Sequence, residues 1–253
     1  MRRLLITLLF PLCCLGQSLK SNVDQFIEKK QFIKAKDTLQ TLLKVKPNDL
    51  EAIELLGDVY SNQKDWDQAI EQYEKLVELN SNEANYHYKY GGALGMKALS
   101  VNKLRALPYL GDMEEAFLKA AELDPTHIEN LWALTRYYMH VPAIIGGSKQ
   151  KAWKYTDELM AISPVDGYLA KGHFYEDDED FEKAEIYYEK AIQIGGSYNC
   201  YKHLYDLYLV FENPQKALKT MENYYSSKGD ERALQLIKQV CTEYNLTSSI
   251  LKN

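Results

Sequence analysis

The sequence predicts an all-α protein, a solenoid of antiparallel helix pairs with a capping helix at its C-terminal end. Three observations predict this fold. Stretches of about 12 to 14 residues with apolar side chains at helical spacing alternate with polar turns. One pattern of small and aromatic residues recurs at intervals near 34 residues. No segment has the apolar–polar alternation or the Asn-Gly turns that are typical of β-hairpins.

The composition is that of an ordinary globular protein. The chain has 253 residues, of which 46% are hydrophobic and 26% charged, which excludes collagen-like, disulfide-rich and disordered chains. Tyrosine is the exception: its 20 residues indicate aromatic packing that is repeated many times. The formal net charge of -6 argues against nucleic acid as a partner.

The first element, residues 1–16, has the pattern of a signal peptide. Arg2 and Arg3 precede an uncharged apolar run, and Gly16 supplies the small residue of a cleavage site. We therefore expect export, to a bacterial periplasm, and a soluble mature chain that begins at Gln17. No later apolar stretch is long enough to span a bilayer, so we expect no transmembrane segment in the mature chain.

The four cysteines leave two questions open. A lipid anchor on Cys13 or Cys14 is the alternative to a soluble exported protein, although neither cysteine follows the Gly or Ala of a lipobox. After cleavage only Cys200 and Cys241 remain, either as one disulfide or as two buried thiols.

The next element, residues 17–229, consists of repeats. Residues 50–82 contain Leu-Gly-x2-Tyr followed by Ala-x3-Tyr, and residues 165–196 repeat the pattern with small changes. Both segments resemble the tetratricopeptide repeat (TPR), a pair of antiparallel helices. The resemblance implies a right-handed superhelix that binds other proteins.

The small residue of each second helix indicates how many repeats there are. It occurs at six positions: Ala35, Ala69, Met113, Ala152, Ala184 and Ala217. Two long intervals predict insertions at residues 98–111 and 141–148, each between the first and second helix of its unit. We expect residues 98–111 to form a prolonged helix and then a turn, with Asp112 capping the following helix. Residues 230–253 are expected to form a capping helix and a tail.

The sequence contains no motif for catalysis. It lacks G-x-S-x-G, H-E-x-x-H and the glycine loop of nucleotide sites, and its five histidines stand singly. We therefore expect no enzymatic activity, catalytic residue, cofactor or metal site. The sequence favours an adaptor or scaffold of the cell envelope that binds a protein or peptide. The alternatives are a small-ligand-binding accessory protein and a lipoprotein-like outer-membrane assembly factor.

The resemblance implies that the partner lies along a concave groove formed by the first helices. The groove positions include an acidic pair, an aromatic centre and polar residues: Glu54, Asp58, Tyr88, Trp132, Arg136, Met139 and His173. Trp132 would anchor a peptide and Arg136 would bind a carboxylate, unless Trp132 only packs between neighbouring units. The second candidate is the edge formed by the insertions, with Tyr109 and Ile144, unless the apolar side chains there only cover each other.

Overall fold

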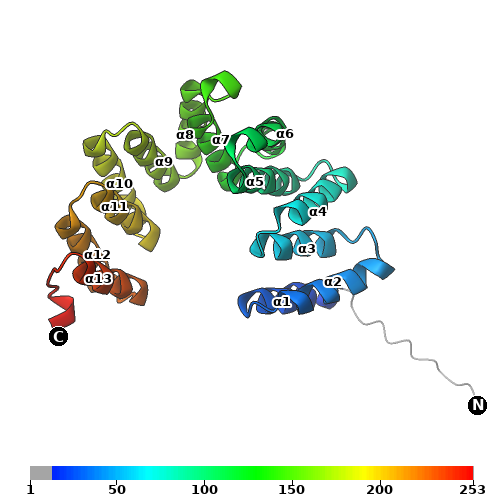
Figure 1. The fold of residues 1–253 in the computed structure, drawn as a ribbon, viewed down its shortest axis with the longest axis horizontal. Helices are drawn as coiled ribbons and strands as arrows, with labels where there is room; N and C mark the ends of the chain where they lie inside the picture. Colours follow the sequence, from blue (N-terminus) through cyan, green and yellow to red (C-terminus); the bar gives the residue numbers. More distant parts are fainter. Residues whose placement is uncertain (1–12, 253) are drawn as a thin grey trace, which may run out of the picture. The chain divides into compact units, whose positions relative to one another are not determined.

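The computed structural model describes residues 13–252, with side chains from Leu19 onward (Figure 1). This part of the chain contains no strand, and none of its helices is long and apolar enough to cross a membrane. Thirteen α-helices and two 3-10 helices follow one another: α1 (Cys13–Glu28), α2 (Phe32–Val45), α3 (Leu50–Asn62), α4 (Trp66–Leu79), α5 (Ala84–Ser100), α6 (Lys103–Leu123), α7 (Ile128–His140), η1 (Ala143–Ile145), α8 (Lys149–Ile162), α9 (Pro164–Asp177), α10 (Phe181–Gly195), α11 (Tyr198–Val210), α12 (Pro214–Lys228), α13 (Glu231–Glu243) and η2 (Ile250–Lys252).

Consecutive helices pack as pairs, from α1 with α2 to α11 with α12, and α13 packs against α12. The predicted all-α fold of helix pairs is therefore confirmed. Most of the predicted signal peptide lies in residues 1–12, outside the described residues, so cleavage before Gln17 stays a prediction.

The chain divides into two compact units, Met1–His127 and Ile128–Asn253. Unit 1 contains α1 to α6, and unit 2 contains α7 to α13. All six marker positions of the repeats are buried in these units, as a close contact between paired helices requires. Ala69 of α4 and Ala184 of α10 are fully buried.

Two glycines allow a tyrosine ring to pass between paired helices. A Cβ on Gly57 of α3 would lie 2.4 Å from Cε1 of Tyr73 in α4. A Cβ on Gly172 of α9 would lie 2.3 Å from Cε1 of Tyr188 in α10. The missing side chain of each glycine therefore makes room for the ring that joins the two helices.

The C-terminal helix α13 lies where the sequence predicts a capping helix. Ala233, Ile237 and Val240 are fully buried on its inner face. Cys200 and Cys241 are two separate buried thiols.

One part of the expectation for residues 98–111 is wrong. The prolonged helix α5 ends at Ser100 and the chain turns at residues 101–102, but Asp112 lies inside α6 and does not start it. Asn102 starts α6 instead, since its Oδ1 accepts a hydrogen bond from the Arg105 N–H at 3.1 Å. Pro108 lies inside α6, where it removes one helical hydrogen bond without ending the helix.

Residues 141–148 link α7 to α8 and contain the short 3-10 helix η1. α7 ends at His140, and Gly146 has a φ of 113°, a backbone conformation that favours glycine. Ser148 then caps α8 by accepting a hydrogen bond from the Lys151 N–H at 3.2 Å.

Candidate interaction surfaces

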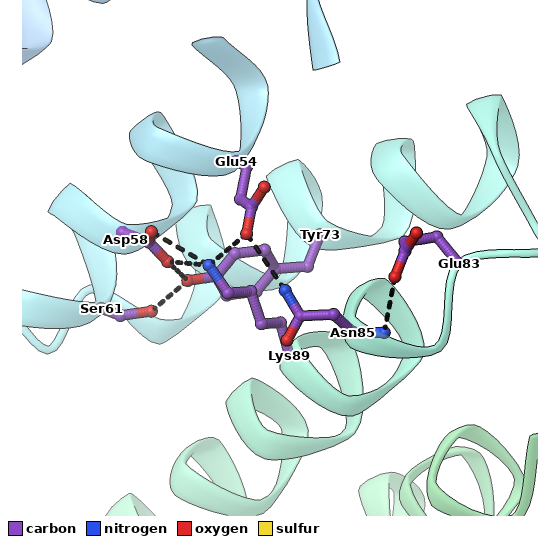
Figure 2. Close-up of polar contacts among 7 residues, drawn as sticks. All are labelled: Glu54, Asp58, Ser61, Tyr73, Glu83, Asn85 and Lys89. Atoms are coloured by element: carbon purple, nitrogen blue, oxygen red, sulfur yellow. Dashed lines mark hydrogen bonds and ion pairs between the residues drawn. The ribbon is translucent and has the colours of Figure 1, made fainter. Parts of the chain in front are cut away.

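Unit 1 contains a network of polar side chains on α3, α4 and α5, the Lys89 network, made of Glu54, Asp58, Ser61, Tyr73, Asn85 and Lys89 (Figure 2). Nζ of Lys89 lies 2.6 Å from Oε1 of Glu54 and 2.8 Å from Oδ1 of Asp58. The Tyr73 hydroxyl donates a hydrogen bond to the same Asp58 oxygen at 2.7 Å. Nδ2 of Asn85 donates one to Glu54 at 3.2 Å.

The Lys89 network neutralises part of the predicted acidic pair. Burial by itself would lower the pKa of Lys89, but the carboxylates of Asp58 and Glu54 have the larger combined effect, and the pKa is raised. Burial and the Asp58 carboxylate raise the pKa of Tyr73, which therefore stays a neutral donor. The contacts of Glu54 and Asp58 with Tyr73 and Lys89 connect α3 to α4 and α5. Because the two carboxylates share the ammonium group of Lys89, they attract a cationic partner less than two free carboxylates would.

Unit 2 contains a similar network, the Tyr188 network, made of His173, Glu176, Tyr188 and His203. The Tyr188 hydroxyl donates to Oε2 of Glu176 at 2.5 Å and lies 3.0 Å from Nδ1 of His173. Burial alone would raise the pKa of Glu176, but His173, whose Nδ1 lies 3.6 Å from Oε2, and the hydrogen bond from Tyr188 lower it. Burial and then His173 lower the pKa of His203 to about 4.

Trp132 lies in the packing of unit 2. Its indole N–H donates to Oδ1 of Asp166 in α9 at 2.9 Å, and its ring packs edge-on against His173, 5.9 Å between centroids. The ring is half-buried against the core of unit 2. These contacts support the alternative in which Trp132 packs against neighbouring helices.

The other predicted residues fall into two groups, because the structure divides between His127 and Ile128. In unit 1, Tyr88 is half-buried with its ring 4.9 Å from that of His127, and Tyr109 is half-buried on α6. In unit 2, Arg136 is exposed and Met139 half-buried on α7. Ile144, which follows α7, is 93% exposed, so the neighbouring side chains do not cover it.

A groove of about 830 Å³ lies on α4, α5 and α6 of unit 1. Five carboxylates line this acidic groove, together with one lysine and a few apolar and aromatic groups: Glu74, Val77, His87, Tyr90, Gly111, Asp112, Glu114, Glu115, Ala116, Leu118, Lys119 and Glu122. Nζ of Lys119 lies 2.9 Å from Oε1 of Glu122. The groove therefore has an excess of negative charge.

Tyr90 lies near three of the carboxylates of the groove. Burial raises its pKa, and the carboxylates of Glu74, Asp112 and Glu115 raise it further. Sequence reasoning missed the groove because Glu74 and Asp112 belong to different repeats and lie on second helices. Acidic positions on successive second helices are the signal that predicts such a groove.

The described residues contain no group of three or more His, Cys, Asp or Glu side chains that is arranged to hold a metal ion.

Comparison with known families explains the recurring helix pairs. A model described as "TPR repeat" matches residues 57–97, and one described as "Tetratricopeptide repeat" matches residues 165–194. Two segments of the chain therefore match tetratricopeptide repeats. One matched repeat lies in each unit, at the two segments whose sequence pattern is most complete.

Several solved structures have a similar fold. A tetratricopeptide repeat protein from Parabacteroides merdae is 13% identical, with a TM-score of 0.60 over 91% of this chain and 87% of that one. The pilF protein of Pseudomonas aeruginosa is 16% identical, with a TM-score of 0.57 over 88% and 96%. MamA is 24% identical, with a TM-score of 0.53 over 68% and 92%. No curated protein sequence matches the chain.

The repeat register relates the two networks. Tyr73 and Tyr188 occupy the same position of their tetratricopeptide repeats, and each hydroxyl bonds to a side chain that follows the repeat glycine, Asp58 or His173. Each tyrosine thus joins both helices of its repeat at a first-helix position that the sequence assigns to partner binding.

Proposed function

We propose that the protein is a non-catalytic adaptor and that its acidic groove binds a basic segment of a partner protein. The observation that carries this proposal is the groove itself, in which five carboxylates and one lysine surround a space of about 830 Å³. Tetratricopeptide repeats are typically interaction scaffolds, and the two matched repeats support the same class of function.

The lining of the groove specifies the chemistry of the segment. Lysine or arginine side chains of the partner would lie against Glu74, Asp112 and Glu115, and the Tyr90 ring would accept a cation on its face. Val77 and Leu118 would contact an apolar residue beside those cations. Charge pairs at the rim mainly accelerate association, so binding should weaken as salt is added.

A photo-crosslinking residue at Leu118, which is 38% exposed in the groove, tests the proposal. Crosslinking in the native cell should join the groove to a lysine- or arginine-rich segment of one protein, identified by mass spectrometry. A synthetic peptide of that segment should then bind the purified chain. The triple variant Glu74→Gln, Asp112→Asn, Glu115→Gln should lower its association rate at low salt about tenfold or more.

The matched control removes three carboxylates elsewhere on unit 1, at the exposed positions Glu28, Asp37 and Glu71. This variant has the same net charge but keeps the groove. If both triple variants bind the peptide equally, or if the crosslinked segment is acidic, the groove is not the binding site.

Two of the residues predicted from the sequence, Arg136 and Ile144, remain proposed contacts of unit 2, since both are exposed. We also propose export to a periplasm, which the basic start, the apolar run and Gly16 support. N-terminal sequencing of the native protein should find Gln17 first. A retained Met1, or a lipid on Cys13 or Cys14, would contradict that proposal.

A further inference from the structure

The corner between α5 and α6, residues 96–107 of unit 1, exposes a group of aliphatic side chains. Leu99 and Leu104 are each 81% exposed, and Met96 and Leu107 are 43% and 44% exposed. Single exposed apolar residues are ordinary, but four within one corner indicate a surface that contacts a membrane or another protein.

The α5–α6 corner lies near the start of α4. Nζ of Lys97 in α5 lies 2.6 Å from Oδ1 of Asp67, in the first turn of α4. Three further residues extend α5 beyond Lys97, about 4.5 Å of helix. Leu99 belongs to this extension, and Leu104 belongs to the first turn of α6 that follows it.

The charge of the corner is opposite to that of the protein. Residues 84–111 contain no Asp or Glu, whereas the whole chain has a net charge of -6. Lys97 is paired with Asp67, but Lys103 and Arg105 are exposed and form no ion pair within residues 19–252. A negatively charged surface would therefore attract this corner and repel most of the remaining surface of the protein.

We propose that the α5–α6 corner docks on an anionic lipid surface. Leu99 and Leu104 enter the boundary between headgroups and acyl chains, and Lys103 and Arg105 contact lipid phosphates. Interfacial anchors combine leucine with lysine or arginine in this way. A protein partner fits the corner less well, because leucine is under-represented among the residues that dominate protein interfaces. The proposal is independent of the acidic groove.

A fluorescent label on the corner reports on the corner separately from the apolar N-terminus. In the full chain with Cys13→Ser and Cys14→Ser, an environment-sensitive dye is attached at Ser100→Cys, an exposed position of the corner. A second variant carries the dye at Asn82→Cys, beside the opposite end of α5. Cys200 and Cys241 are buried, and the chain without an added cysteine measures any labelling of them.

Vesicles of phosphatidylcholine with phosphatidylglycerol should shift the emission of the dye at residue 100 to the blue and leave the dye at residue 82 unchanged. Vesicles of phosphatidylcholine alone should give a much weaker shift. Leu99→Asp with Leu104→Asp, or Lys103→Glu with Arg105→Glu, should each weaken vesicle binding about tenfold or more.

The matched controls are Val45→Asp, at a side chain that is 78% exposed, and Lys44→Glu with Lys46→Glu. Both control sites lie on unit 1 but outside the corner. Each control substitution changes the charge by the same amount as the corresponding substitution in the corner, so vesicle binding should persist in both controls. The proposal is overturned if the dye at residue 100 does not respond, if both dyes respond alike, or if the controls lose as much binding as the corner variants.

Discussion

At the scale of single residues, His203 shows how packing changes the charge of a side chain. Its ring lies 4.7 Å from that of His173 and 5.7 Å from that of Tyr188, between centroids. Burial is the largest cause of the lowered pKa and His173 the second, while Asp206 and Glu176 act in the opposite direction. His203 is therefore neutral in the folded protein at a pH at which an exposed histidine is charged.

We predict that the stability of unit 2 falls as the pH falls from 6.5 toward 4. In this interval the unfolded chain binds a proton at His203 and the folded chain does not, so acid favours unfolding. Since the ring is partly exposed, we expect a loss of about 1–2 kcal/mol in the free energy of unfolding. Urea denaturation at several pH values should show this loss, and His203→Gln should remove it.

His140→Gln is the control for this prediction. His140 is exposed and pairs with Asp177 at 3.4 Å, so its replacement should leave the loss between pH 6.5 and 4 in place. An equally steep pH dependence in the His203→Gln protein would assign the effect to other groups.

At the scale of the helix pair, we predict that Gly→Ala substitutions inside helices have opposite effects on stability at different positions, although helix propensity alone favours alanine at each of them. Gly57→Ala and Gly172→Ala should lower the free energy of unfolding by about 1–3 kcal/mol, because the new methyl group meets a tyrosine ring. Gly92→Ala in α5 should raise it by about 0.5–1 kcal/mol, since no atom lies within 4 Å of the added Cβ. Urea denaturation of the three variants tests both signs. A stabilised Gly57→Ala protein would mean that Tyr73 moves aside at little cost.

The sequence predicts helix pairs well where spacing along one chain segment decides the structure. The marker alanines and the repeat glycines are local to a pair, and their burial follows from the repeat pattern. The start of α6 is not predicted correctly, because Asp112 has the local pattern of a cap while Asn102 and the packing of α5 extend the helix. Contacts between repeats are also missed: the pairing of Lys89 with Glu54 and Asp58 joins residues about one repeat apart.

At the scale of the whole molecule, stability is distributed along the chain. Helices contact mainly the helices before and after them in sequence, and the chain divides into two compact units. In such repeat proteins the stability is the sum of the repeats and of their contacts with neighbours. A local defect should therefore stay local.

We predict that Ala69→Leu and Ala184→Leu weaken different parts of the molecule. Both alanines are fully buried, so the larger side chain should cost about 1–3 kcal/mol at the helix pair that contains it. Hydrogen exchange of Ala69→Leu should become faster in α3, α4 and their neighbours α2 and α5, and should stay unchanged in α9 to α12. Ala184→Leu should show the reverse, with α9 and α10 affected most, so each variant is the control for the other. Faster exchange in all helices of either variant would show that the two units unfold as one cooperative body, contrary to the repeat-by-repeat stability inferred from the contacts.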